Sequence, residues 1–191
     1  MGASNEVGRR AILKGALAFA FVQGAQAAQG AQNNDDPASA RPKEGDLLVK
    51  VGDASTTPLT PDDIPLVAMQ TMAWAIDPKD RTVRSGSRLN RILLVRFDPE
   101  KLSAETRLRA AGGVVAYTAI CTHTGCEVID WLPEEQLLHC PCHYSRFDPR
   151  DGARVVDGPA PRTLPALPLQ VVEGKLTVAK PFITRVGFEP A

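Results

Sequence analysis

The sequence predicts an all-β protein built from short antiparallel strands. Its 191 residues include 16 prolines and 15 glycines, whereas aromatic residues make up only 5% of the chain. Proline and glycine interrupt helices and occupy turns, so this composition favours many short strands over a helical bundle. A hairpin signal near the end of the chain supports the same fold class. Two apolar runs, 167–172 and 175–179, flank the dipeptide Glu173-Gly174, and a two-residue turn containing glycine is typical of a β-hairpin.

Three further apolar runs predict strands earlier in the chain. Such runs, bounded by polar or turn-forming residues, are typical of strands that are buried in a sheet. The run 114–120 leads directly into Cys121, and the proline-rich stretch 59–65 is expected to be a loop. The three predicted strands are 46–51, 91–97 and 114–120.

One segment, 98–111, is predicted to be a helix. Asp98 can cap the first turn, and Pro99 suits the first helical position because it has no N–H to leave unpaired. The pair Gly112-Gly113 would end this helix.

The first residues have the pattern of an export signal. The pair Arg9-Arg10 precedes an apolar run at 15–22, which is followed by the A-x-A sequence at 25–27. A basic region, a short apolar region and a small-residue cleavage site define a secretory signal. The run R-R-A-I-L-K resembles the twin-arginine export signal. We therefore expect residues 1–27 to direct export to the periplasm.

The same apolar run is too short for a durable membrane anchor. Lys14 and Gln23 bracket only eight residues, whereas a spanning helix needs about 20. Cleavage is therefore expected, with membrane tethering through an uncleaved signal as the alternative. Residues 28–44 are polar and rich in alanine, glutamine and asparagine at their start, which predicts a flexible tether.

The charge balance excludes some classes of function. The chain carries 22 basic and 22 acidic residues and has no formal net charge. This excludes a broadly basic nucleic-acid-binding protein. No Rossmann glycine fingerprint, P-loop or nucleophile elbow occurs in the sequence.

The residues capable of metal chemistry gather in two short motifs. C-T-H-T-G-C occupies 121–126, and C-P-C-H occupies 140–143. Their C-x-H and C-x-x-H spacings provide two thiolates and two imidazoles, a set that suits either zinc or an iron–sulfur cluster. Ligands only two residues apart are unusual for a structural zinc site. The 13 residues between the motifs are enough for a β-hairpin, and a non-redox zinc-binding module stays as the remote alternative.

The two motifs together resemble the Rieske [2Fe–2S] family in its high-potential, disulfide-bearing form. C-T-H-T-G-C and C-P-C-H-Y-S match its two ligand loops, and Gly158-Pro159-Ala160-Pro161 matches the loop that shields the cluster. The resemblance implies a Rieske domain at 45–191. It also implies the family's fold, an antiparallel β-sandwich base with an inserted cluster-binding subdomain at about 120–163. One [2Fe–2S] cluster per chain is expected.

The resemblance also assigns roles to individual residues. Two cysteines hold one iron of a Rieske cluster and two histidines hold the other. In this family a serine and a tyrosine further along the second loop donate hydrogen bonds to sulfur. Ser145 matches the serine, but Phe147 stands in place of the tyrosine and lacks its hydroxyl. The implied ligands are Cys121, His123, Cys140 and His143, and the implied disulfide joins Cys126 to Cys142.

The expected function is that of a periplasmic electron-transfer subunit, not catalytic alone, which passes single electrons to a c-type cytochrome or a similar acceptor. The sequence is compatible with two kinds of parent complex. A cytochrome bc complex would supply electrons from quinol, although Thr124 stands where its Rieske subunit usually has an apolar residue. The run C-P-C-H-Y-S-R-F-D-P resembles the small subunit of arsenite oxidase, whose partner is a molybdenum-containing large subunit.

This chain alone cannot hold the catalytic site of a ring-hydroxylating oxygenase. That class also needs a mononuclear iron held by two histidines and a carboxylate, and only His139 is left over here. A Rieske ferredoxin that serves an oxygenase is an open alternative, although the export signal and the implied disulfide argue against it. His139 is expected to be an ordinary strand residue, and Trp131 to pack in the cluster-binding subdomain. The acidic residues Asp130, Glu134 and Glu135 are expected to form a solvated face.

Overall fold

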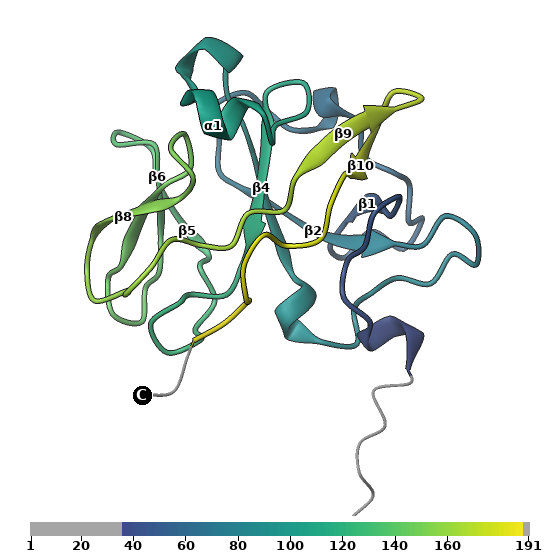
Figure 1. Ribbon diagram of the computed structural model, residues 1–191, viewed down its shortest axis with the longest axis horizontal. Coiled ribbons are helices and arrows are strands. Elements are labelled where there is room, and N and C mark those ends of the chain that lie inside the picture. Colours follow the sequence, from purple (N-terminus) through teal and green to yellow (C-terminus); the bar gives the residue numbers. More distant parts are fainter. Residues whose placement is uncertain (1–35, 189–191) are drawn as a thin grey trace, which may run out of the picture. The chain divides into compact units, whose positions relative to one another are not determined.

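The computed structural model describes residues 36–188. The predicted export signal, 1–27, lies outside these residues, as does the tether as far as residue 35. Two antiparallel sheets form the described part, which confirms the predicted all-β class (Figure 1). The large sheet has the order β4-β3-β2-β1-β10-β9 and the small one β5-β6-β7-β8. The large-sheet strands are β1 (Leu47–Lys50), β2 (Thr71–Ile76), β3 (Ile92–Arg96), β4 (Val114–Thr118), β9 (Leu169–Val172) and β10 (Lys175–Val178).

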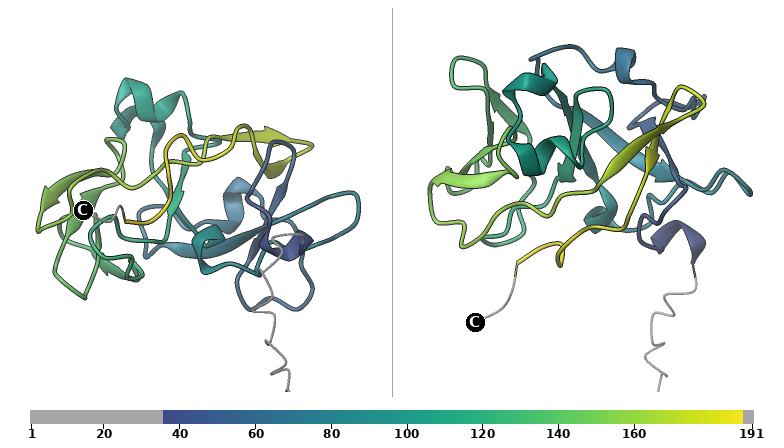
Figure 2. Two further views of the ribbon diagram at one scale, coloured as in Figure 1. Left: turned by 60° about the horizontal axis from the view of Figure 1, so that its bottom comes forward. Right: turned by 45° about the horizontal axis from the view of Figure 1, so that its top comes forward.

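The large sheet is curled, so that its two ends approach each other. The N–H of Leu167, just before β9, donates to the carbonyl of Ala116 in β4 over 2.9 Å. The predicted sandwich is therefore a single sheet that bends back around one inner core, as the two views of Figure 2 show. All six strands contribute to this inner core, which includes Leu48, Ala73, Ile92, Leu94, Val114, Ala116, Leu169, Leu176 and Val178.

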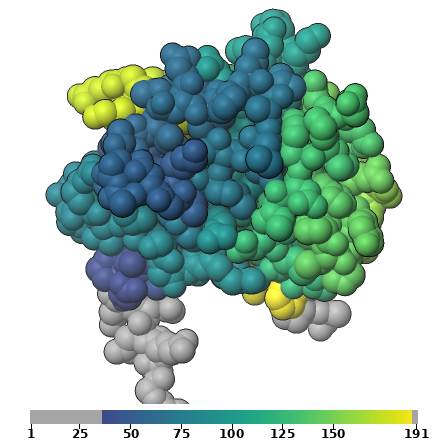
Figure 3. Space-filling model, turned by 180° about the vertical axis from the view of Figure 1, so that it is seen from behind, coloured from purple at the N-terminus to yellow at the C-terminus, as the bar shows by residue number. Residues whose placement is uncertain are grey.

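The small sheet is inserted in the chain between β4 and β9. It consists of β5 (Asp130–Leu132), β6 (Leu137–His139), β7 (Arg146–Asp148) and β8 (Arg154–Asp157). The expected hairpin between the two cysteine motifs is the β5–β6 pair. Seen from behind, this green region packs along one side of the blue and teal large sheet (Figure 3).

Strands β3 and β4 are buried on both faces, which explains their unbroken apolar sequences. Because side chains alternate along a strand, Leu94 and Ala116 enter the inner core, whereas Leu93 and Tyr117 face a second, outer core. The outer core lies between the large and small sheets, and the Tyr117 hydroxyl crosses it to donate to the Pro149 carbonyl over 2.8 Å. The two sheets therefore share one packed interior.

The prediction of one continuous helix over 98–111 is wrong. Asp98 caps a 3-10 turn, η4 (Pro99–Lys101), and Ser103 caps a separate short helix, α1 (Ala104–Arg107). The break follows from a tertiary contact, since the N–H of Ser103 donates to the carbonyl of Arg150 in the small-sheet region over 2.9 Å. Among the described residues no helix is long and apolar enough to cross a membrane.

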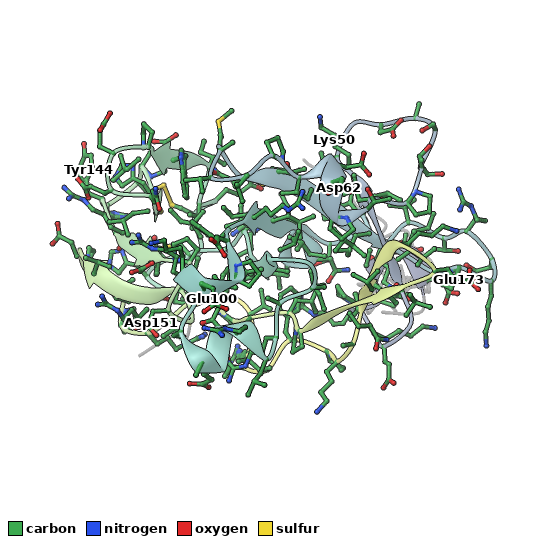
Figure 4. The ribbon with its side chains drawn as sticks, turned by 90° about the horizontal axis from the view of Figure 1, so that it is seen from above. Lys50, Asp62, Glu100, Tyr144, Asp151 and Glu173 are labelled. Atoms are coloured by element: carbon green, nitrogen blue, oxygen red, sulfur yellow. A yellow bond between two sulfur atoms is a disulfide. The ribbon has the colours of Figure 1, made fainter. Side chains whose placement is uncertain are left out.

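The predicted C-terminal hairpin is confirmed. Strands β9 and β10 pair in register, from Lys175 opposite Val172 to Val178 opposite Leu169. Both turn residues have positive φ, 50° at Glu173 and 76° at Gly174, as a type I′ turn requires. Glu173 lies at the end of the molecule opposite Tyr144 of the second cysteine motif (Figure 4).

The chain before β1 is fixed to the large-sheet region by buried polar groups. Arg84 donates to the carboxylates of Asp46 and Asp77, with N–O distances of 2.5 to 3.1 Å. The amide of Asn90 donates to the Ala40 carbonyl over 2.7 Å. This segment before β1 contains the 3-10 turn η1 (Pro37–Ser39). Two further 3-10 turns, η2 (Pro61–Asp63) and η3 (Arg88–Asn90), lie between strands of the large sheet.

Candidate functional site

Two loops with the same backbone geometry carry the cysteine and histidine motifs. The first ligand loop, 121–126, follows β4, and the second ligand loop, 140–145, joins β6 to β7. In the first loop the Gly125 N–H donates to the Cys121 carbonyl over 3.1 Å, and the Cys121 N–H donates to the Cys126 carbonyl over 2.8 Å. These bonds fold the loop back on itself.

The second ligand loop repeats this pattern. Tyr144 donates to the Cys140 carbonyl and Cys140 donates to the Ser145 carbonyl, both over 2.9 Å. Gly125 and Tyr144 occupy equivalent positions, with φ of 78° and 63°. Glycine adopts this left-handed conformation freely, but tyrosine does so only at a cost in strain. Tyr144 is 68% exposed and stacks on His139, with ring centroids 5.9 Å apart.

The predicted cysteine ligands are both free thiols in the outer core. Cys121 and Cys140 are each 1% exposed. Burial raises the pKa of Cys121 to about 11, and the nearby Cys140 thiol acts in the same direction. The Ser145 hydroxyl acts in the opposite direction and lowers the pKa of Cys121.

The predicted histidine ligands form a second pair. The ring centroids of His123 and His143 are 4.5 Å apart, with the rings nearly perpendicular. The Nδ1 atom of His123 is buried and has no hydrogen-bond partner. An unpaired buried nitrogen is costly unless something binds it. His143 is exposed, so the imidazole pair reaches the surface while the thiol pair does not.

The donor set fits a binuclear iron–sulfur cluster better than a single zinc ion. A structural zinc needs four ligands around one point. Two separate pairs, sulfur with sulfur and nitrogen with nitrogen, match a cluster with two irons. The unpartnered Nδ1 of His123 is the nitrogen available for such a bond.

A disulfide joins the two ligand loops, as predicted. Cys126 and Cys142 are bonded, with their Cα atoms 6.5 Å apart, a distance within the usual range for disulfides. The bond is visible in yellow beside the labelled Tyr144 (Figure 4). Neither cysteine can therefore ligate a metal, and the two remaining cysteines are the buried thiols.

The loop Gly158–Pro161 packs against the second ligand loop. The Ala160 N–H donates to the Ser145 hydroxyl oxygen over 3.1 Å. At Gly158, which has φ of 89°, an added Cβ atom would lie 2.5 Å from Cα of Ser145 and 2.9 Å from the Tyr144 carbonyl oxygen. Only glycine permits this approach, so Gly158 fixes the position of the loop beside Ser145.

The other candidate residues have structural roles. His139 contacts the Asp130 carboxylate, with 3.3 Å between Nδ1 and Oδ2. Trp131 packs against Phe97 with ring centroids 6.4 Å apart, as expected for a packing residue. Phe147 is fully buried in the outer core together with Cys121 and Cys140.

Arg88 was missed by sequence reasoning, although it donates to the carbonyl of Gly125 in the first ligand loop. The two residues are 37 positions apart. No motif marks the arginine.

This chain is similar to known Rieske proteins. A model of the Rieske [2Fe–2S] domain matches residues 80–168. The chain is 35% identical over 149 residues to the cytochrome bc1 complex Rieske iron–sulfur subunit of Streptomyces lividans, covering 75% of this chain and 85% of that relative. The Streptomyces coelicolor subunit is also 35% identical, but the chain spans only 41% of its length. A Haloferax mediterranei protein named as a respiratory nitrate reductase subunit Rieske is 43% identical over 97 residues, which is 50% of this chain and 43% of that protein.

Two solved structures with similarity to this chain are named as Rieske proteins. The plasma membrane Rieske protein of Synechocystis is 26% identical, covers 57% of this chain and 84% of its own, and gives a TM-score of 0.37. The soluble domain of Rieske protein II from Sulfolobus acidocaldarius gives 0.38 at 23% identity, covering 50% of this chain and 65% of its own.

This chain belongs to the Rieske [2Fe–2S] family. It is an iron–sulfur electron-transfer protein whose domain binds one [2Fe–2S] cluster.

Replacing Gly158 with alanine tests the packing of its loop. The new Cβ would overlap the Ser145 backbone, and forced overpacking costs roughly 1–3 kcal/mol in addition to the strain of positive φ. Gly174→Ala is the matched control, since Gly174 has φ of 76° but no atom within 4 Å of an added Cβ. We expect thermal unfolding to occur at a lower temperature in Gly158→Ala than in Gly174→Ala, with less iron retained. Equal effects in the two variants would contradict the close packing.

Proposed function

We propose that the four predicted ligands hold the cluster in two pairs. Cys121 and Cys140 bind the inner iron, and His123 and His143 bind the outer iron. The observation that carries this assignment is the arrangement of two buried thiols and two facing imidazoles on loops joined by a disulfide. The unpartnered Nδ1 of His123 supports it.

The bound cluster supplies one-electron redox chemistry. Neutral imidazoles in place of two thiolates remove negative charge from the site, which raises Rieske potentials to about −150 to +300 mV. The buried thiol pair is shielded from water, and the Ser145 hydroxyl draws electron density from the Cys121 sulfur. The exposed His143 gives electrons a short route to a partner that contacts the surface there.

The proposed setting is a periplasmic oxidoreductase in which this subunit passes electrons to a c-type cytochrome or a similar acceptor. The twin-arginine sequence at residues 9–14 supports export. A disulfide between the ligand loops also suits an oxidising compartment. Relatives named as cytochrome bc1 subunits support a complex that oxidises quinol.

A molybdenum-containing partner is the second candidate. The polar Thr124 is exposed next to His123, at the position where an apolar residue would favour contact with a quinol. The Haloferax relative named for a respiratory nitrate reductase supports a partner other than a cytochrome bc complex.

Metal analysis tests the ligand assignment directly. The purified protein should contain two irons and two acid-labile sulfides per chain, and its reduced form should give a Rieske-type EPR signal. His123→Ala and His143→Ala should each abolish that signal, because the second iron loses a ligand. His139→Ala should retain it, since His139 contacts Asp130 and Tyr144. One zinc per chain without sulfide would refute the assignment.

A reporter fusion tests export. Residues 1–35 fused to a reporter active only in the periplasm should give signal, and the double change Arg9→Lys and Arg10→Lys should remove it, because the twin-arginine pathway reads the arginine pair. Asn5→Gln is the control, since it is a conservative change in the same segment but outside residues 9–14. Undiminished export of the double variant would argue against this route.

Phe147→Tyr should raise the reduction potential. Phe147 lies in the same buried core as both cysteine ligands, so a hydroxyl added there can donate to a ligand sulfur and favour the more negative, reduced cluster. Phe97→Tyr is the control, because Phe97 belongs to the same core but packs against Trp131. Voltammetry of the wild type and both variants measures the shift. A potential at or below that of the wild type in Phe147→Tyr would show that the hydroxyl does not reach sulfur.

A further inference from the structure

Two arginines outside the cysteine and histidine motifs hold the first ligand loop from the large-sheet side. Arg88 begins η3 and donates from Nη2 to the carbonyl of Gly125. Arg91 directly follows η3 and forms an ion pair with Glu127, with 2.8 Å between Nη1 and Oε2. Residues three apart on a 3-10 turn lie on the same side. The two guanidinium groups therefore contact Gly125 and Glu127, the residues on either side of the disulfide cysteine Cys126.

Neither contact is freely exposed to water. An added Cβ atom on Gly125 would lie 3.1 Å from the Phe188 ring and 3.2 Å from the Arg88 guanidinium, so the ring and the cation cover the same point of the loop. Arg162 holds the segment carrying Phe188 through a 2.6 Å bond to the Gly187 carbonyl. Partial burial strengthens electrostatic interactions because fewer water molecules screen them.

The second arginine is also partly enclosed. Its guanidinium lies over the ring of Trp74, 5.1 Å from the ring centroid. The side chains of Arg91 and Glu127 are 28% and 30% exposed, and Nε of Arg91 is buried without a hydrogen-bond partner. The position of this arginine is thus fixed by the tryptophan and the carboxylate together.

We propose that Arg88 and Arg91 are positioning residues that fix the first ligand loop and raise the reduction potential of the cluster. This inference rests on the proposed ligand set, in which Cys121 and His123 belong to that loop. Reduction adds one negative charge to the cluster, so a nearby guanidinium stabilises the reduced state more than the oxidised state. Arg88 acts through its own charge, since the contact it makes is with an uncharged carbonyl. Arg91 neutralises Glu127, whose unpaired carboxylate would oppose reduction.

Arg96 provides a matched control at the opposite end of β3, the strand that follows Arg91. It pairs with Asp62 over 2.9 Å and donates to the Pro61 carbonyl over 3.1 Å. Its side chain is 28% exposed, the same as that of Arg91. Asp62 lies well away from Tyr144 of the second ligand loop (Figure 4). Removing Arg96 therefore breaks similar contacts without changing the charge near the cluster.

The experiment compares Arg88→Gln, Arg88→Lys, Arg91→Gln and Arg96→Gln in the cluster-loaded protein. We expect a lower reduction potential in Arg88→Gln and Arg91→Gln, a potential closer to wild type in Arg88→Lys because the charge is kept, and no shift in Arg96→Gln. Hydrogen exchange of the amides at 121–127 should be faster in Arg88→Gln and Arg91→Gln only. This second readout reports on the loop independently of electron transfer.

The outcomes separate this inference from the proposed function. Wild-type potential and exchange in both Arg88→Gln and Arg91→Gln would overturn the inference, as would equal shifts in Arg96→Gln. Loss of the cluster in Arg88→Gln alone would support the role of Arg88 in fixing the first ligand loop. The effect on the reduction potential would then be measured in Arg88→Lys and Arg91→Gln. A wild-type protein with no Rieske EPR signal would instead refute the proposed function itself.

Discussion

The structure depends on keeping two short loops at one fixed separation, because the four proposed ligands come from both loops and a single cluster would join them. Neither loop can set this distance alone, since each is stabilised mainly by its own backbone hydrogen bonds. The disulfide between Cys126 and Cys142 joins them directly. Residues outside the two loops add further contacts. Gly158 and Ala160 contact the second ligand loop, and Arg88 and Phe188 contact the first.

The large sheet provides the rigid body to which these supports are attached. Its strands β3 and β4 are buried on both faces, so the same two strands contribute to the inner core of the large sheet and to the outer core that holds both cysteine thiols. Close-packed interiors resist deformation. Electron transfer is fastest when little has to move, and a site whose two thiols are buried in such a core while His143 is exposed meets that requirement.

Local sequence patterns were sufficient to predict the cysteine and histidine motifs, but not the residues outside these motifs that contact the ligand loops. The two cysteine motifs and the Glu173-Gly174 hairpin could be predicted because neighbouring residues define each of them. Strand β2 was missed because its alanines have low strand propensity. Its pairing with β1 on one side and β3 on the other stabilises it as a strand. The break at Ser103 comes from a carbonyl 47 residues away, and the contact from Arg88 to Gly125 spans 37 residues. Contacts of this range leave no periodic signal in the sequence.

The placement of β1 has a consequence for the order in which the chain can fold. This strand lies between β2, its near neighbour in sequence, and β10, which ends at Val178. During synthesis one edge of β1 must therefore stay unpaired until β10 has emerged. An unpaired edge invites association between nascent chains. The long sequence separation of this pairing also predicts slow folding, with closure of the large sheet as a late step.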